Sequence, residues 1–392
     1  MRRRFPMLLG PLFCALSLTL TLNTFGQTAP SSTVEVAYVL TSDGIQVYDV
    51  DRQTGIPTFE GLATVPLKFA AVVPSADDHF VYVYGSNAIS GGPETFYVYP
   101  TDSTGMLSQS AIQKLNLPNP ISYFTISPNG TFAYAVVSKQ DANRETLAGI
   151  VFFTLDPATG RVTAPPKLVA SYPPNGPCGS AFSASLGLVG ISPSGDRLYE
   201  KWFCVGYDDN NASYYTRSID HETGALGADV LTLSAGGSNG SFSVVNFTPK
   251  VILDYYVEAD FFNDTLYIYP LNGGVSPIFS CTAAMLAACG ASGSDRVEPS
   301  GNYIFFSQLS GTTAITKLDL QANEIVDTGN SFPDGVTMFS PDSALIYTES
   351  DGINPFIFPI YTFDLARGAA SRGGQIVIEK SQFASVVPAL RK

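Results

Sequence analysis

The chain of 392 residues carries 21 basic and 34 acidic residues, so its formal net charge at pH 7 is −13. This charge repels nucleic acid and anionic membrane surfaces, and no basic cluster offsets the repulsion, so we expect no nucleic-acid partner. The 20 tyrosines, 26 phenylalanines, 35 glycines and 27 prolines favour strands joined by turns over helices.

The N-terminus has the three parts of a secretory signal peptide. Arginines at positions 2–4 precede an apolar run over 6–22, and small residues lead up to Gly26, after which we predict cleavage. Cleavage removes three arginines and no acid, which leaves 18 basic and 34 acidic residues and a net charge of −16. We therefore expect a secreted or periplasmic protein that is not inserted in a membrane after cleavage. A retained transmembrane anchor is the weaker alternative, because Gly10 and Pro11 interrupt the run.

Four of the five cysteines remain after cleavage. An even number in an exported protein indicates two disulfides, with three connectivities open and buried free thiols as the alternative. Zinc is disfavoured because the spacing is unlike that of a zinc site and the chain has only two histidines, so we expect no metal. The four are Cys178, Cys204, Cys281 and Cys289.

An apolar strand that ends at proline recurs seven times in the mature chain, at intervals of 42 to 65 residues. A pair of residues suited to a tight turn follows in most copies, as in Asn129-Gly130 and Ser194-Gly195, because proline ends the hydrogen-bonded ladder. The seven prolines are Pro74, Pro128, Pro193, Pro249, Pro299, Pro341 and Pro388.

Three further strands complete each repeat. The second is rich in aromatic residues, as in Phe80–Tyr84, and the third often ends at an acid before a Thr-Gly turn, as Asp51 does before Thr54-Gly55. The fourth is more variable, and Ser110–Leu115 is an example. Each repeat is therefore a four-stranded antiparallel unit, which is too small to bury both of its faces alone.

Seven such sheets packed face to face around an axis form an all-β, seven-bladed β-propeller, which we predict for residues 34–392, after the signal peptide (1–26) and a short linker (27–33). The chain enters in the middle of a blade, and Gln382–Val387 supplies the innermost strand that this blade lacks, which closes the ring. A β-sandwich or tandem small β domains are the alternatives, but neither explains a half unit at each end. The fifth repeat is the least clear, because Val251–Asp264 departs from the pattern.

The segment Val34–Gly55 resembles the repeat of the lactonase-like, or YVTN-type, seven-bladed propellers, through its run Ala-Tyr-Val-Leu-Thr-Ser-Asp-Gly and its end Val-Asp-x-x-Thr-Gly. Ile126–Tyr134 and Ile191–Tyr199 look the same, and the resemblance covers nearly the whole mature chain. It implies an exported bacterial propeller. The family includes 6-phosphogluconolactonase-like enzymes and many exported propellers of unassigned role, so it implies either lactone hydrolysis or an unassigned function.

In a propeller, the loops from second to third strands and from fourth to first strands share one face, here called the long-loop face. Cys178 precedes an innermost strand and Cys204 ends its neighbour, so both should lie on this face. We predict a Cys178–Cys204 bridge and a local Cys281–Cys289 bridge. The long segments expected on this face are 85–95, 138–149, 171–185, 204–213, 280–295 and 349–355.

Charged residues on the long-loop face are candidate ligand-binding residues. Arg296 lies on an innermost strand, where its guanidinium could hold a carboxylate or phosphate; an ion pair with Asp295 or an acid of a neighbouring blade is the alternative. Lys139 and Arg144 belong to a charged loop, for which a solvated surface is the alternative.

Two further groups complete the candidates. Asp208 and Asp209, followed by two asparagines, offer oxygen ligands to a hard cation, but they lack the spacing of an EF-hand, and a polar turn is the alternative. His79 and His221 fall in turns on the opposite face, and no Gly-x-Ser-x-Gly elbow occurs. The sequence therefore identifies no catalytic residue and no cofactor.

These observations favour an exported, monomeric propeller that binds a small-molecule or protein partner on the long-loop face. The alternative is a hydrolase of sugar lactones, in which an Asp or Glu would act as base and Arg296 as its electrostatic partner. A structural ring within a larger cell-surface assembly is a third hypothesis. Whether the protein is an enzyme stays open at this point.

Overall fold

The computed structural model describes the chain from Val34 to Leu390, and of some strands, among them those within 231–297, it describes the backbone alone. The residues between these ends that lie outside the description are 68, 87–93, 141–145, 173–175, 177–182, 193, 206–209, 237–240, 244–254, 261–264, 271–278, 282–295, 308–310, 320–321, 323, 334, 350–354, 380 and 382–383. No helix in the described part is long and apolar enough to cross a membrane.

Among the described residues the strands form seven four-stranded antiparallel sheets. The first holds β28 (Ala384–Leu390), β1 (Val34–Thr41), β2 (Gly44–Asp51) and β3 (Pro57–Ala63); the second, β4 (Phe69–Pro74), β5 (Phe80–Ser86), β6 (Glu94–Pro100) and β7 (Gln113–Leu117); the third, β8 (Ile121–Ile126), β9 (Phe132–Gln140), β10 (Thr146–Thr154) and β11 (Lys167–Ser171). The fourth holds β12 (Ser183–Ile191), β13 (Arg197–Val205), β14 (Asn210–Ser218) and β15 (Val230–Gly236); the fifth, β16 (Ser241–Ser243), β17 (Tyr255–Asp260), β18 (Thr265–Pro270) and β19 (Phe279–Cys281). The sixth holds β20 (Arg296–Val297), β21 (Tyr303–Ser307), β22 (Thr312–Asp319) and β23 (Glu324–Pro333); the seventh, β24 (Gly335–Phe339), β25 (Leu345–Glu349), β26 (Phe356–Asp364) and β27 (Ala369–Ile378).

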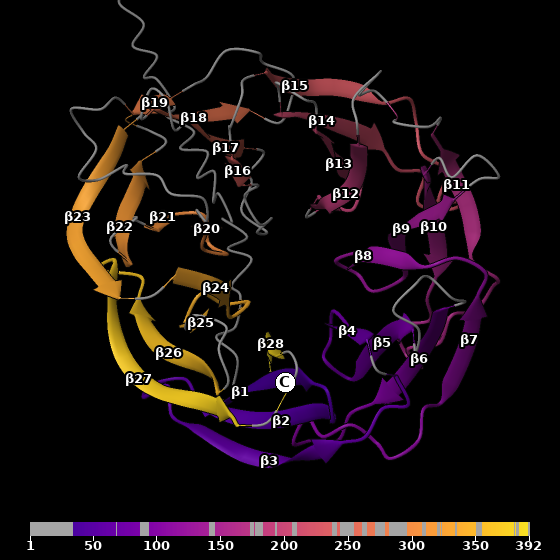
Figure 1. The fold of residues 1–392 in the computed structure, drawn as a ribbon, viewed down its shortest axis with the longest axis horizontal. Helices are drawn as coiled ribbons and strands as arrows, with labels where there is room; N and C mark the ends of the chain where they lie inside the picture. The colour runs from indigo at the N-terminus through magenta and orange to yellow at the C-terminus, as the bar shows by residue number, and fades with distance from the viewer. Residues whose placement is uncertain are drawn as a thin grey trace, which may run out of the picture.

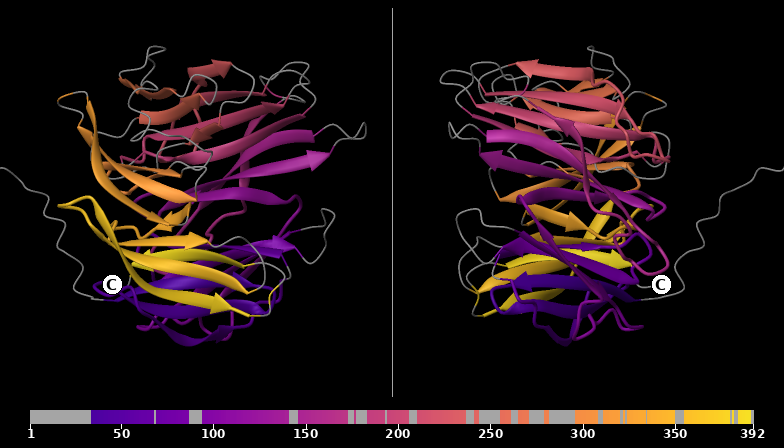
Figure 2. Two further views of the ribbon diagram at one scale, coloured as in Figure 1. Left: turned by 60° about the vertical axis from the view of Figure 1, so that its left-hand side comes forward. Right: turned by 90° about the vertical axis from the view of Figure 1, so that its right-hand side faces the viewer.

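The sheets stand side by side around a common centre (Figures 1 and 2). In every sheet the strand that comes first in the predicted repeat lies toward the centre, and the fourth lies at the outside (Figure 1). The inner strands are β4, β8, β12, β16, β20, β24 and β28. The four-strand repeat inferred from the sequence is therefore the repeat of the fold.

The two ends of the described chain meet in the first sheet. There β28 pairs antiparallel with β1, with Ala384–Leu390 running opposite Glu35–Thr41. The sequence placed this strand at Gln382–Val387 and had proline end it, and that detail is wrong, because the pairing runs through Pro388. Proline is tolerated there because β28 is an edge strand of its sheet and needs to donate on one side only.

The fifth sheet departs most from the expected register. Its inner strand β16 pairs with β17 at Ser241–Ser243, upstream of the predicted strand end at Phe247–Pro249. That predicted end lies outside the described residues. The irregular segment noted in the sequence, Val251–Asp264, contains β17.

The core lies in the seams between neighbouring sheets. Across the first seam, Val36 and Tyr38 of β1 pack with Val81 and Val83 of β5 in one apolar cluster. The predicted aromatic second strands supply the bulk of these seams, because alternate residues of each strand face the sheets on either side. Their largest fully buried side chains are Tyr38, Tyr82, Tyr134, Phe305, Phe306 and Tyr347.

A serine hydroxyl caps the turn between the first and second strands in several sheets. Ser127 Oγ donates to Asn129 Oδ1 at 2.7 Å and accepts the amide of Phe132 at 3.1 Å. Ser75 and Ser340 make the same two kinds of bond in the second and seventh sheets. The Pro-containing turn motif read from the sequence is therefore a hydrogen-bonded cap.

Glu298 takes the place of that serine in the sixth sheet. Its carboxylate is fully buried and accepts the amides of Asn302 at 2.6 Å and Tyr303 at 3.2 Å. It also accepts the hydroxyls of Ser300 and Ser343. Because these donors satisfy both carboxylate oxygens, Glu298 is a structural residue of the turn.

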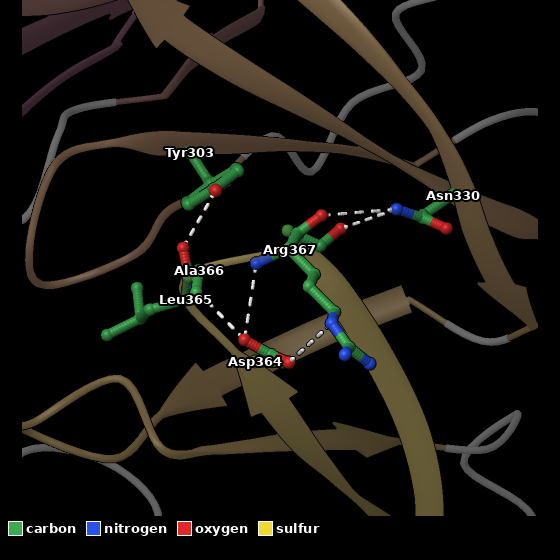
Figure 3. Close-up of polar contacts among 7 residues, drawn as sticks. Tyr303, Asn330, Asp364, Leu365, Ala366 and Arg367 are labelled. Carbon is green, nitrogen blue, oxygen red and sulfur yellow. Dashed lines mark hydrogen bonds and ion pairs between the residues drawn. The ribbon is translucent and has the colours of Figure 1, made fainter.

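The turns between third and fourth strands hold one sheet to the next. In the turn after β26, Asp364 Oδ1 accepts two amides of its own turn at 2.9 and 3.2 Å (Figure 3). From the sixth sheet, the Tyr303 hydroxyl donates to the Leu365 carbonyl at 2.8 Å, and the Asn330 amide donates to the Gly368 carbonyl at 3.0 Å. The acid thus shapes the turn, and the turn's carbonyls then bind the neighbouring sheet.

Candidate functional site

Tyr123 is unusual among the described residues of the inner strands. It lies in β8 with a φ of 51°, a conformation that bulky residues rarely adopt, and its side chain is 55% exposed. The register of β8 against β9 shifts between Ser122 and Thr125. This bulge lets Phe124 turn into the seam while Tyr123 turns to solvent, because it adds a residue to the strand.

Two neighbours position Tyr123. A Cβ on Gly187, in the adjacent inner strand β12, would lie 3.4 Å from the Tyr123 Cζ, so the ring rests against bare backbone. The buried Glu94 carboxylate accepts the amide of Ile121 and thereby ties the start of β8 to β6 of the second sheet. Burial raises the pKa of Glu94, which the Ile121 amide partly offsets.

Phe124 anchors the bulge from the other side. Its ring is 6% exposed and lies 5.2 Å from Phe96 and 5.3 Å from Phe153, centroid to centroid. Tyr82 and Tyr84 contact the same ring at 5.6 and 6.0 Å. Because Phe124 is locked in this aromatic cluster, the backbone of Tyr123 has little freedom to relax its strained conformation.

A pocket of about 240 Å³ lies on the face of the short turns, between the first and second sheets. Val36, Tyr38 and Ala389 line it together with residues 77–79, 101–103 and 105, among them His79. Val36 is a small side chain at this position of its second strand. The equivalent position in five other second strands holds a larger residue. These residues are Phe80, Phe132, Arg197, Tyr303 and Leu345.

Two of the carboxylates at this pocket are engaged by their own turns. Asp77 accepts the hydroxyl of Ser75 at 2.6 Å, and Asp102 accepts the amide of Thr104 at 2.7 Å. Within the described residues, no three His, Cys, Asp or Glu side chains come together as a metal site would need. In the part of the chain that is described, the pocket therefore presents no metal centre.

A second polar group is buried between the third and fourth sheets. Glu200, 1% exposed, accepts the Tyr172 hydroxyl at 2.5 Å and the Arg217 Nε at 2.6 Å. Arg217 also donates to the Gly227 carbonyl at 3.1 Å, and Trp202 packs against Tyr172. Because Tyr172 follows β11 of the third sheet while Glu200 and Arg217 belong to the fourth, we interpret this group as a bridge between sheets.

Most of the site residues predicted from the sequence lie outside the described residues or have only their backbone described. Arg296 begins β20 opposite Phe305, and Lys139 lies near the end of β9, but the side chains of Arg296 and Lys139 are outside the description. By backbone, Cys204 lies in β13 and Cys281 ends β19. Asp295, Arg144, Asp208, Asp209, Cys178 and Cys289 lie outside the described residues, so the ligand-binding and disulfide assignments stay predictions.

The two histidines lie in short turns. His79 is in the turn between β4 and β5, and His221 is in the turn between β14 and β15. The ring of His221 meets the edge of Phe132 at 6.0 Å, so a contact between sheets accounts for it. Within the described residues, no hydrogen bond joins the ring of either histidine to the side chain of a serine, threonine or cysteine.

Comparison with known proteins adds information on the fold alone. No family model and no curated protein sequence matches the chain. Among solved structures it is similar to prolyl oligopeptidase B from Galerina marginata (TM-score 0.54, 11% identity, 87% of this chain and 49% of that one) and to a puromycin hydrolase (0.53, 12%, 91% and 55%). It is also similar to an oligogalacturonate lyase in complex with manganese (0.51, 12%, 84% and 84%).

The arrangement of sheets and this likeness define the class of the protein. Four-stranded antiparallel sheets set around a centre make a β-propeller, and the chain has that fold. It spans about half the length of the oligopeptidase and the puromycin hydrolase. At identities of 11–12% the likeness says nothing of activity, and no match supports membership of the lactonase-like family.

Proposed function

We propose that the protein is a seven-bladed β-propeller, closed by β28, that binds a small molecule with a flat face near the centre of its long-loop face. Tyr123 is the observation that carries this proposal. A strained, exposed tyrosine is costly by about 1–3 kcal/mol, and such strain concentrates at functional sites. Tyr123 stands near the start of β8, and the start of a first strand is the end expected on the long-loop face, because the loops from fourth to first strands share that face.

The chemistry of the site favours stacking over ion pairing. The exposed phenol ring offers an apolar face and a polar edge, which suits the ring of a sugar or another flat ligand. The acidic chain, with a formal net charge of −13, disfavours an anionic ligand. A neutral sugar or sugar lactone fits both conditions, and the lactone also agrees with the family that the repeats resemble.

Replacing Tyr123 with Asn separates binding from folding. Asn tolerates positive φ, so the free energy of unfolding should stay constant or rise by about 1 kcal/mol. We expect at least one member of a panel of neutral sugars and sugar lactones to raise the melting temperature of the natural protein, and to lose at least tenfold in affinity for the variant. Thermal unfolding and calorimetry measure the two effects.

Phe59 on the outer strand β3 provides the matched control, because it is an aromatic residue exposed to 56% on a different surface. The Phe59→Asn variant should bind as the natural protein does. A panel member that binds the natural protein and the Tyr123→Asn variant equally well would contradict the site. Turnover of a lactone that is lost in the Tyr123→Asn variant would favour hydrolysis over binding alone.

We also propose that the protein is exported. The proposal rests on the charged start, apolar run and small residues of 1–26. When the full chain is expressed in a bacterium, the protein recovered outside the cytoplasm should begin at Gln27, as mass spectrometry of its N-terminal peptide can establish. A cytoplasmic product that retains residues 1–26 would overturn the proposal.

A further inference from the structure

Glu35 is a buried acid in the seam between the first and seventh sheets. It lies in β1, where its backbone is paired with Val50 of β2 and Leu390 of β28, and it is 0% exposed. Its side chain crosses to β25, where the Tyr347 hydroxyl donates to Glu35 Oε1 at 2.9 Å. The other carboxyl oxygen, Oε2, has no hydrogen-bond partner among the described residues.

Apolar residues fill the seam beside Glu35. Ala37 and Val50 of the first sheet and Leu345 of the seventh belong to the buried cluster that fills this seam. An ionised carboxylate placed among such residues loses its hydration and gains little in return. The geometry alone therefore favours the neutral acid.

The charged groups around Glu35 come from three turns. Arg52, after β2, acts on Glu35 through its charge but forms an ion pair with Asp342 of the turn before β25. Asp78, in the turn before β5, opposes ionisation of Glu35. The Ser340 hydroxyl favours the ionised form of Glu35. Its Oγ, however, donates to Asp342 Oδ1 at 2.8 Å.

The remaining titratable groups are Tyr347 and Asp49. Tyr347 is fully buried, and burial together with Glu35 raises its pKa well above the ordinary value, so it stays a neutral donor. Asp49 pairs with Val36, which places it on the opposite face of the sheet from Glu35. No cation other than Arg52 acts on Glu35 within the described residues.

We propose that the seam between the first and seventh sheets is a pH-sensitive latch. Neutral Glu35 keeps this seam closed and ionised Glu35 loosens it, so that β1 and β28 are the first strands to lose protection against hydrogen exchange. Burial raises the pKa of Glu35 from its ordinary value of 4.5 to about 8 in the folded protein. The folded state therefore holds a proton that the unfolded chain releases. The resulting stabilisation is complete below about pH 4.5 and is lost as the pH rises through about 8.

The latch sits where it can affect the whole ring. The residue next to it in the ladder, Leu390, ends β28, the strand on which the proposed closure depends. The Arg52–Asp342 ion pair spans the same seam, and the Gly374 amide donates across it to the Gly55 carbonyl at 3.0 Å. Loosening at Glu35 thus removes support from the seam that joins the two ends of the chain.

Unfolding by urea between pH 5 and 9 tests the latch in the full mature chain. The quantity to follow is the folding equilibrium constant of Glu35→Gln divided by that of the natural protein. This ratio should rise by up to tenfold per pH unit and level off above about pH 8, which gives a total rise of about 10³-fold. Glu60→Gln, which removes an exposed acid of β3, is the control and should keep a constant ratio. Equal pH dependence in Glu35→Gln and the natural protein overturns the proposal.

Hydrogen exchange supplies a local readout. After correction for intrinsic rates, the protection of 34–41 and 384–390 relative to 132–140 should fall with rising pH in the natural protein and stay constant in Glu35→Gln. Tyr347→Phe keeps the test open if Glu35→Gln does not fold. Because the Tyr347 hydroxyl favours the carboxylate, its removal should shift the loss of stability to higher pH, and an unshifted or lower transition overturns the proposal.

Discussion

Removal of residues 381–392 is expected to lower the free energy of unfolding by on the order of 5 kcal/mol or to prevent folding, since each large apolar side chain exposed costs about 1.5–3 kcal/mol. The deletion removes β28, in which Val386 and Ala389 are each 2% exposed. It also uncovers one side of β1 and leaves the inner edge of the first sheet without a partner. Urea unfolding and size-exclusion chromatography measure the loss.

Trimming only Arg391 and Lys392 is the matched control, because both lie beyond the end of β28. That shorter chain should unfold like the natural protein. A 381–392 deletion that is monomeric and unfolds at the same urea concentration as the control would show that β28 does not close the ring.

Gly160→Ala is expected to lower the free energy of unfolding by roughly 2–4 kcal/mol, from about 1 kcal/mol of backbone strain and about 1–3 kcal/mol of overpacking. Gly160 has a φ of 66°, and its amide closes the turn to the Asp156 carbonyl at 2.7 Å. A Cβ there would lie 2.3 Å from the Phe80 Cγ of the preceding sheet. The added methyl must therefore push the third sheet away from the second.

Gly311 offers a control with the same kind of backbone and no neighbour to strike. Its φ is 78°, and a Cβ there would meet nothing within 4 Å. Gly311→Ala should therefore cost only the strain, about 1 kcal/mol. Equal losses in the two variants, as measured by urea unfolding, would mean that the turn of the third sheet does not carry the contact between sheets.

Most of the fold could be predicted because packing and turn residues repeat. Phe132 and Tyr134 belong to a second strand, and Asp156 with Gly160 forms the turn after a third strand; similar residues recur at these places in several of the other sheets. The prediction failed in detail at Pro388, which continues a strand. Like the other first strands of the repeat, β28 is an edge strand, where proline is tolerated, so the proline by itself does not mark where the strand ends.

The candidate site could not be predicted in the same way. The run around Tyr123 has the composition of an ordinary strand, and its bulge follows from how Phe124 packs among Phe96 and Phe153. Charge drew attention instead to Arg296 and Asp208, whose side chains the structure does not describe. A charged residue is conspicuous in a sequence, whereas a backbone strain is visible only in three dimensions.

The sequence by itself determined that this chain is an acidic β protein built from repeated four-stranded units. Those properties are local, because alternation, turns and caps are written in residues close together. Only the tertiary structure decided that Glu35 lies against Tyr347, more than three hundred residues away, and that Tyr123 rests on Gly187. Burial and strain depend on what the neighbouring sheet presents, so the properties that suggest function came from the contacts between sheets.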